Sequence, residues 1–156
     1  MEKSGEKRKK LALSGGFYNT LDDKGRVSFP ARLKSDFSGD RLVMTRGIEK
    51  CLYLFPPELW KEFEQKLENP SVMSKDWRKM QRHFLGWATE ADIDKSGRLA
   101  IPQSLREYAG FSRDVIIMGL GRRIEVWDAG FYKETQGETD DGRGLEDIAE
   151  SSGLLF

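Results

Sequence analysis

Two arginines, each four residues after an aspartate, are the side chains of this sequence best suited to recognition chemistry. Arg26 and Arg98 end a D-x-x-G-R pattern that begins at Asp22 and again, 72 residues later, at Asp94. A loop arginine presents a planar fork of donors that can grip a guanine edge or a phosphate. We therefore predict nucleic-acid contacts from Arg26 first and from Arg98 second.

The same spacing allows a structural alternative. Asp22 and Arg26 lie across a turn and could pair with each other, and Asp94 and Arg98 could do the same. An aspartate at the start of a turn also accepts hydrogen bonds from the backbone, and both copies keep it. The residues predicted to structure the loops are Asp22, Asp94 and Gly97.

The two copies differ in charge. Lys24 faces Ser96 in the second copy, and Arg32 faces Ser104. The first copy is therefore more positive in and after its loop, and we predict that it makes the main DNA contact. The residues assigned to DNA binding are Arg26, Lys24, Gly25, Arg32 and Arg98.

The chain contains few of the side chains that catalysis and metal binding require. The chain has one cysteine, Cys51, and one histidine, His83, whereas structural zinc takes four ligands, usually Cys or His. A single cysteine excludes an intrachain disulfide and fits a reducing compartment. Asp22 and Asp94 could act as an acid–base pair, but their turn context favours structure. We predict no catalytic residue, no metal and no cofactor.

An internal duplication positions the two loops. At an offset of 72, residues 22–56 match the second half with eight identities and no gap, which favours a true repeat. Each half reads as strand, strand, short helix, strand, strand (β–β–α–β–β). A unit of roughly 45 residues buries too little to stand alone, so we expect the halves to share one core. The identical residues of the first half are Asp22, Gly25, Arg26, Pro30, Leu33, Arg41, Val43 and Gly47.

The rest of the chain is predicted to link and flank the two halves. Amphipathic patterns indicate linker helices at 58–68 and 71–87. No apolar run approaches the length of a membrane span or a signal peptide, which predicts a cytoplasmic protein. The predicted segments are a basic flexible extension (1–14), the first half (15–57), the linker helices (58–88), the second half (89–131) and an acidic flexible tail (132–156).

The sequence resembles the MraZ family of bacterial regulators. The resemblance is carried by FYNTLDDKGRVSFPARLK at 17–34, by ADIDKSGRLAIPQSLREYAG at 91–110 and by the helices between them. It implies an α+β, mainly β fold, in which a duplicated AbrB-like swapped-hairpin (double-psi-like) barrel is joined by linker helices. It also implies that the Asp-x-x-x-Arg loop reads DNA, which points to Arg26.

The resemblance implies a function as well. It suggests a ring-shaped homo-oligomer, an octamer, that binds repeated boxes of double-stranded DNA in its own promoter. The ring would associate with the nucleoid and control division and cell-wall genes, with no membrane or small-molecule substrate. Two alternatives stay open. One is a protein-interaction ring that uses Trp60 or the final GLLF, and the other is an antitoxin, which usually carries a single copy.

Overall fold

The computed structural model describes residues 11–68, 74–135 and 144–154. Both halves have the predicted β–β–α–β–β order. The first half consists of β1 (Leu13–Thr20), β2 (Arg26–Ser28), α1 (Ala31–Lys34), β3 (Arg41–Arg46) and β4 (Leu52–Phe55). The second half consists of β5 (Thr89–Asp92), β6 (Arg98–Ala100), α4 (Gln103–Ala109), β7 (Asp114–Gly121) and β8 (Ile124–Asp128).

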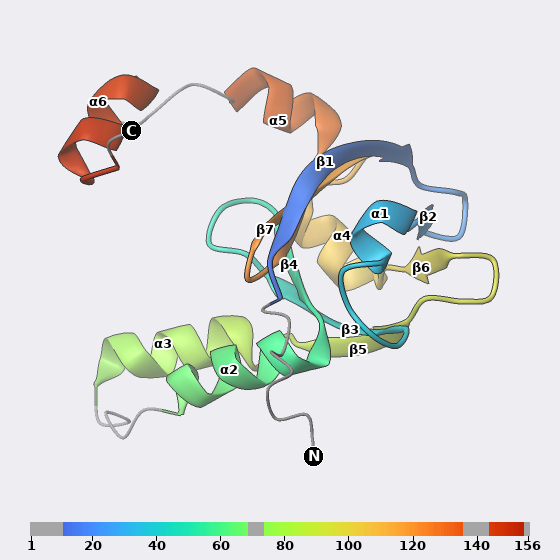
Figure 1. Cartoon of the computed structure of the whole chain (residues 1–156). Coiled ribbons are helices and arrows are strands. Elements are labelled where there is room, and N and C mark those ends of the chain that lie inside the picture. The colour runs from blue at the N-terminus through green and yellow to red at the C-terminus, as the bar shows by residue number, and fades with distance from the viewer. Residues whose placement is uncertain (1–10, 69–73, 136–143, 155–156) are drawn as a thin grey trace, which may run out of the picture.

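The strands of the two halves interleave (Figure 1). One antiparallel sheet has the order β1-β7-β8-β4-β3-β5, and a second, two-stranded sheet pairs β2 with β6. The first strand of each half therefore pairs with a strand of the other half, β1 with β7 and β5 with β3. The halves are not separate domains but share one core, as their small size predicts.

The register corrects the ungapped alignment of the two halves. Thr20 pairs with Asp114, and Asp92, which is equivalent to Thr20, pairs with Arg41. Asp114 and not Arg113 is thus the equivalent of Arg41. The second half has one extra residue before β7, where α4 runs longer than α1, and one fewer in the turn before β8. Three of the eight identities, those of Arg41, Val43 and Gly47, are therefore structurally out of register.

The core lies between the large sheet and the layer formed by β2, β6, α1 and α4. Val27, Leu33, Leu99 and Leu105 point into it and are fully buried. We expected a closed barrel. The described strands instead form an open sheet with a separate ribbon, because β2 and β6 span only three residues each and pair with each other.

The linker forms a helical hairpin that packs beside β4. Its helices are α2 (Pro57–Leu67) and α3 (Lys75–Phe84). The Ser74 side chain caps α3 by accepting a hydrogen bond from the backbone N–H of Trp77, so this helix starts later than the predicted residue 71. The ring of Phe63 stacks on that of Phe55 with centroids 4.9 Å apart, which fixes the hairpin against the sheet.

The C-terminal segment contains two helices, α5 (Ala129–Thr135) and α6 (Leu145–Ser151). We expected residues 132–156 to be flexible throughout. Glu146 and Asp147 lie in the first turn of α6, where negative charge favours a helix. Most of the expected N-terminal extension falls outside the described residues, and none of the described helices is long and apolar enough to cross a membrane.

Candidate nucleic-acid interface

The first loop is organised around the carboxylate of Asp22. Its Oδ1 accepts hydrogen bonds from the backbone N–H groups of Lys24 and Arg26, both at 2.9 Å. Its Oδ2 accepts one from Nε of Arg26 at 2.8 Å. One carboxylate thus shapes the turn and orients the arginine. The structural role of the Asp22–Arg26 pair and a DNA-contacting role of Arg26 are therefore compatible.

The second loop repeats the turn with a looser arginine. Oδ1 of Asp94 accepts hydrogen bonds from the backbone N–H groups of Ser96 at 2.8 Å and Arg98 at 2.9 Å. Nε of Arg98, however, lies 3.8 Å from Oδ2 of Asp94 and makes no hydrogen bond in the described structure. The Arg98 side chain is therefore held by charge attraction without the directional bond that holds Arg26.

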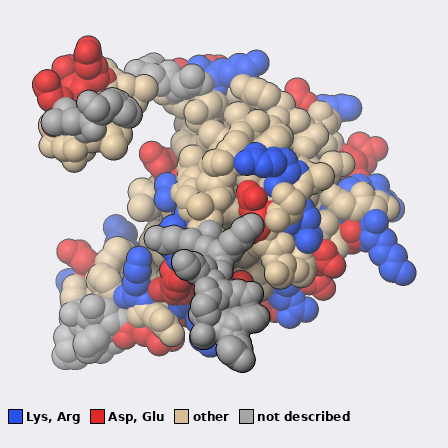
Figure 2. Space-filling view, in the orientation of Figure 1, with Lys and Arg blue, Asp and Glu red and all other residues tan. Residues whose placement is uncertain are grey.

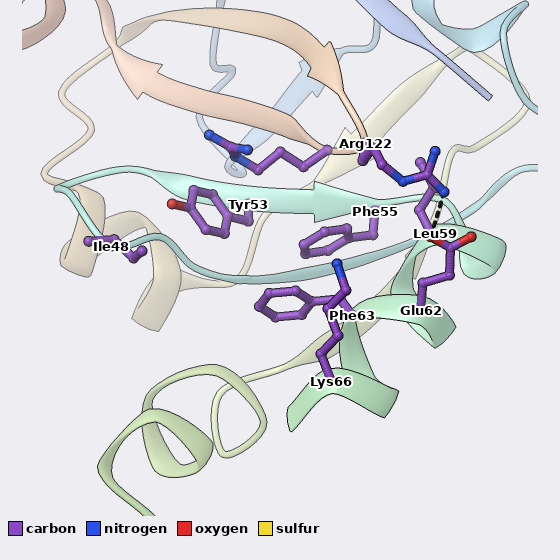
Figure 3. A pocket seen from close by; sticks show the side chains of 9 residues that line it. Ile48, Tyr53, Phe55, Leu59, Glu62, Phe63, Lys66 and Arg122 are labelled. Atoms are coloured by element: carbon purple, nitrogen blue, oxygen red, sulfur yellow. Dashed lines mark hydrogen bonds and ion pairs between the residues drawn. The ribbon is translucent and has the colours of Figure 1, made fainter. Parts of the chain in front are cut away.

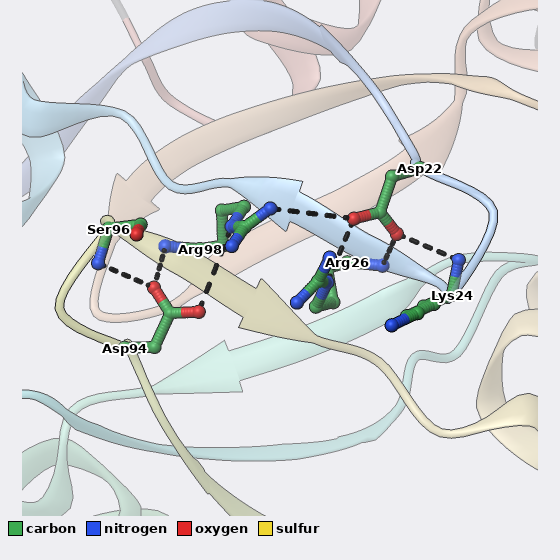
Figure 4. Close-up of polar contacts among 6 residues, drawn as sticks. All are labelled: Asp22, Lys24, Arg26, Asp94, Ser96 and Arg98. Carbon is green, nitrogen blue, oxygen red and sulfur yellow. Dashed lines mark hydrogen bonds and ion pairs between the residues drawn. The ribbon is translucent and has the colours of Figure 1, made fainter.

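Pairing of β2 with β6 brings the two loops together (Figure 4). Arg26 lies opposite Ala100, and Arg98 lies opposite Ser28, so the two arginines are diagonal neighbours on the same face. Val27 and Leu99 occupy the other face and are buried. Nη1 of Arg98 reaches to 3.9 Å from Oδ2 of Asp22. The ribbon thus presents two arginines outward from a fixed base.

The glycines of the two turns show a further difference between the two loops. Gly25 and Gly97 both have positive φ, 77° and 81°, which only glycine adopts readily. A Cβ on Gly25 would lie 2.6 Å from Nε of Arg106, whereas a Cβ on Gly97 would meet nothing within 4 Å. Nε of Arg106 donates to the carbonyl of Ile101 at 2.8 Å. Arg106, which we had not assigned to the site, therefore covers the first loop only.

This asymmetry predicts different effects of matched substitutions. We expect Gly97→Ala to destabilise the fold by about 1–2 kcal/mol, the cost of a left-handed conformation. Gly25→Ala should cost about 0.5–1.5 kcal/mol more, because it displaces Arg106 from its hydrogen bond. Chemical denaturation of the two variants beside the parent chain measures the difference. Equal losses would show that Arg106 does not brace the first loop.

The other assigned residues lie around this ribbon. Lys24 is exposed at the tip of the first loop, and Arg32 is exposed on α1. The loops and ribbon carry cations and carboxylates side by side, and Figure 2 shows blue and red atoms mixed over this part of the surface. The cations on the ribbon, in its loops and over the first loop are Lys24, Arg26, Lys95, Arg98 and Arg106, and the carboxylates are Asp22, Asp23 and Asp94.

Hydrogen bonds set the protonation of both loop carboxylates. The backbone N–H of Arg26 is the largest cause that lowers the pKa of Asp22 below 3.8, and the Arg26 side chain adds to it. The backbone N–H of Arg98 lowers the pKa of Asp94 in the same way. Both aspartates are therefore carboxylates at any pH near neutrality.

The sign of these shifts predicts a pH dependence. A lowered pKa means that each carboxylate contributes stability above its unfolded pKa and loses that contribution as the pH falls through the folded value. We expect the amide signals of Lys24 and Arg26 to stay constant from pH 8 to about pH 4 and to shift only below it, as followed by NMR titration. Asp22→Asn should remove that shift. A transition centred above pH 5 in the parent chain would contradict the assignment.

The one described group with a metal-like donor set is not an open site. Glu49, Cys51 and Glu125 have ligand atoms within 4.8 Å of one another. Glu125, however, pairs with Arg123 at 2.8 Å, and burial raises the pKa of the Cys51 thiol far above its ordinary value. Cys51 is fully buried and belongs to the hydrophobic core.

Comparison with known proteins gives one consistent family. The profile described as "MraZ protein, putative antitoxin-like" matches residues 12–83 and 84–143. A protein of Thermoanaerobacter pseudethanolicus named "Transcriptional regulator MraZ" is 41% identical over 138 residues, which are 88% of this chain and 94% of that protein. A protein of the same name from Treponema denticola is 38% identical over 141 residues, 88% of this chain and 98% of that protein.

Among solved structures, the solution structure of PHS018 from Pyrococcus horikoshii is 17% identical and has a TM-score of 0.30, with 74% of this chain and 87% of that chain covered. That likeness is too low to bear on the fold. The profile match, by contrast, spans both halves of the repeat, and the named relatives align with nearly their whole length. The chain therefore belongs to the MraZ family.

Proposed function

We propose that this chain, whose relatives are named transcriptional regulators, acts by sequence-specific binding to DNA. The observation that carries the proposal is the β2–β6 ribbon with Arg26 and Arg98 on its outer face. A two-stranded ribbon fits the major groove, where an arginine fork reads guanine. Arg26 is the principal reader because its Nε is hydrogen-bonded to Asp22 at 2.8 Å, which leaves the end of the guanidinium aimed and available.

Lys24 and Arg32 have a supporting part in this proposal. Both are exposed, one at the loop tip and one on α1, and both suit phosphate contacts that position a protein on the duplex without reading its sequence. Gly25 supplies the positive φ of the first turn and leaves room for the Arg106 guanidinium. Arg106 joins them because its guanidinium covers Gly25. Arg98 has a secondary reading role, in line with its looser placement.

One ribbon with two arginines supplies few contacts, so the proposal includes several copies acting together. A ring-shaped homo-oligomer, an octamer by family resemblance, would present several ribbons to repeated boxes in its own promoter. Tethered sites raise the apparent affinity through effective concentration. The regulated genes would be those of cell division and cell-wall synthesis, in the cytoplasm at the nucleoid. The interleaved halves would correspond to the swapped-hairpin barrels of AbrB-like proteins.

Fluorescence anisotropy with labelled duplexes tests the proposal. The duplexes are the DNA upstream of the chain's own gene with three boxes, the same DNA with one box, and a shuffled sequence. Each is measured at two salt concentrations. We expect preference for the upstream DNA, tighter binding to three boxes than to one, and a steep loss of affinity with salt from counterion release.

Equal and weak binding to all three duplexes would overturn specific recognition and favour the protein-interaction alternative. Equal affinity for one box and for three would overturn only the part of the proposal that needs several copies. Analytical ultracentrifugation of the same sample gives the number of chains, so the two outcomes are read separately.

A further inference from the structure

An apolar groove lies between the sheet and the helical hairpin, away from the β2–β6 ribbon (Figure 3). A cavity of about 310 Å³ is lined by the rings of Tyr53, Phe55 and Phe63 and by Leu59. A second cavity of about 350 Å³ lies against α3. Ile48 lines both cavities and is 73% exposed. The two cavities thus form one apolar surface, which we call the hairpin groove.

The rim of the hairpin groove is positive. Lys66, Arg122 and Arg123 line the first cavity, and Lys79 lines the second. Glu62 is the one carboxylate among the residues that line the two described cavities, and it pairs with Arg122. Arg123 pairs with Glu125 below the surface, and Lys66 and Lys79 make no ion pair in the described part of the chain. An occupant of this groove would need apolar and acidic groups together.

The C-terminal helix α6 has that composition. No residue of α6 is buried, and Leu145 is 79% exposed. Leu145, Ile148 and Ala149 are three or four residues apart and share one face of the helix. The acidic residues Glu146, Asp147 and Glu150 occupy the other faces, and α6 contains no basic residue. Figure 2 shows red atoms on one side of this helix and tan atoms on the other.

We propose that α6 of one chain docks in the hairpin groove of a second copy. Its apolar face would cover Ile48 and the aromatic wall, and its acidic residues would face Lys66 and Lys79. A second copy is favoured over the same chain because α6 stands apart from the α2–α3 hairpin of its own chain, and none of its residues is buried (Figure 1). This proposal rests on the self-association proposed above.

Cross-linking between differently labelled full-length chains tests the docking. One chain carries Ile48→Cys, the other carries Ser151→Cys on α6, and the two are mixed and treated with a short bismaleimide. The native Cys51 is fully buried and does not compete. We expect a cross-linked heterodimer from this pair and at least tenfold less from a control pair that carries Ser104→Cys, an exposed residue of α4, in place of Ile48→Cys.

A charge-reversed helix and the oligomeric state complete the test. Glu146→Lys, Asp147→Lys and Glu150→Lys together in the Ser151→Cys chain should reduce the heterodimer at least tenfold. A chain with both cysteines that cross-links only within itself would overturn the second copy as occupant. Absence of cross-links in a sample that sediments as an oligomer would overturn the docking alone. A parent chain that sediments as a monomer would overturn the docking together with the proposed ring.

Discussion

Arg26→Ala is expected to abolish the preference for the upstream DNA while leaving the chain folded. The Arg26 side chain is 30% exposed, and its described side-chain partner is the carboxylate of Asp22, so Arg26→Ala removes a surface ion pair and no residue of the hydrophobic core. A good bidentate base contact contributes about 1–3 kcal/mol of discrimination, roughly 5- to 150-fold for each copy. Because several copies bind together in the proposed ring, the losses multiply. Anisotropy with the upstream and shuffled duplexes measures the effect.

Two matched variants make this result specific. Arg26→Lys keeps the charge but loses the planar fork, so we expect salt-dependent binding without sequence preference. Arg41→Ala removes an exposed arginine whose partners, Glu90 and Asp92, lie at the β3–β5 edge, and it should bind like the parent chain. Equal losses from Arg26→Ala and Arg41→Ala would mean that general charge and not the ribbon governs binding. Full preference in Arg26→Ala would contradict the assignment of the reader.

Arg98→Ala gives the comparison between the two halves. Nε of Arg98 lies 3.8 Å from Asp94 and is not hydrogen-bonded, so this arginine is less well fixed than Arg26. A less ordered side chain pays more conformational entropy when it contacts a base. We therefore expect a smaller loss of preference than for Arg26→Ala.

The local part of the site could be predicted from the sequence. An aspartate, a glycine and an arginine at fixed spacing encode a turn by hydrogen bonds within five residues, and the structure contains these bonds in both loops. The order of elements followed from the same short-range signals. The contacts that join the two loops into one site could not be predicted from the sequence, because they depend on strand pairing. Arg98 approaches Asp22, 76 positions away in the sequence, only because β2 pairs with β6.

The alignment of the two halves shows a further limit of sequence reasoning. The identity of Arg41 and Arg113 suggested that these two positions are equivalent. The pairing of β1 with β7 and of β5 with β3 instead makes Asp114 the equivalent of Arg41. A one-residue lengthening before β7 is offset by a shorter turn before β8, so the repeat regains its spacing of 72 at both ends. Similarly, nothing in the charge pattern showed that Arg106 covers Gly25 while Gly97 stays open.

The interleaved sheet leads to the second large effect, which concerns folding. If the chain is cut within 69–73, outside the described residues, each fragment keeps one strand pair of its own, β3 with β4 or β7 with β8, but loses every pairing with the other half. Among the described strands, β1 has β7 as its neighbour in the sheet, and β5 has β3. A single half also buries too little apolar surface to offset its conformational entropy. We expect each fragment alone to lack a cooperative unfolding transition and their mixture to regain one.

Circular dichroism and sedimentation of fragments 1–70 and 71–156, alone and mixed, distinguish the possibilities. The expected result is native-like ellipticity only in the mixture, with a sedimenting species that contains both fragments. A fragment that folds as a homodimer would still obey the pairing rule, since the pseudo-symmetry of the registers lets β1 of one copy pair with β3 of another. A fragment that folds as a monomer would contradict it, because its first strand would have to pair within its own half. The duplication in the sequence therefore supplies a partner strand for each half as well as a second loop.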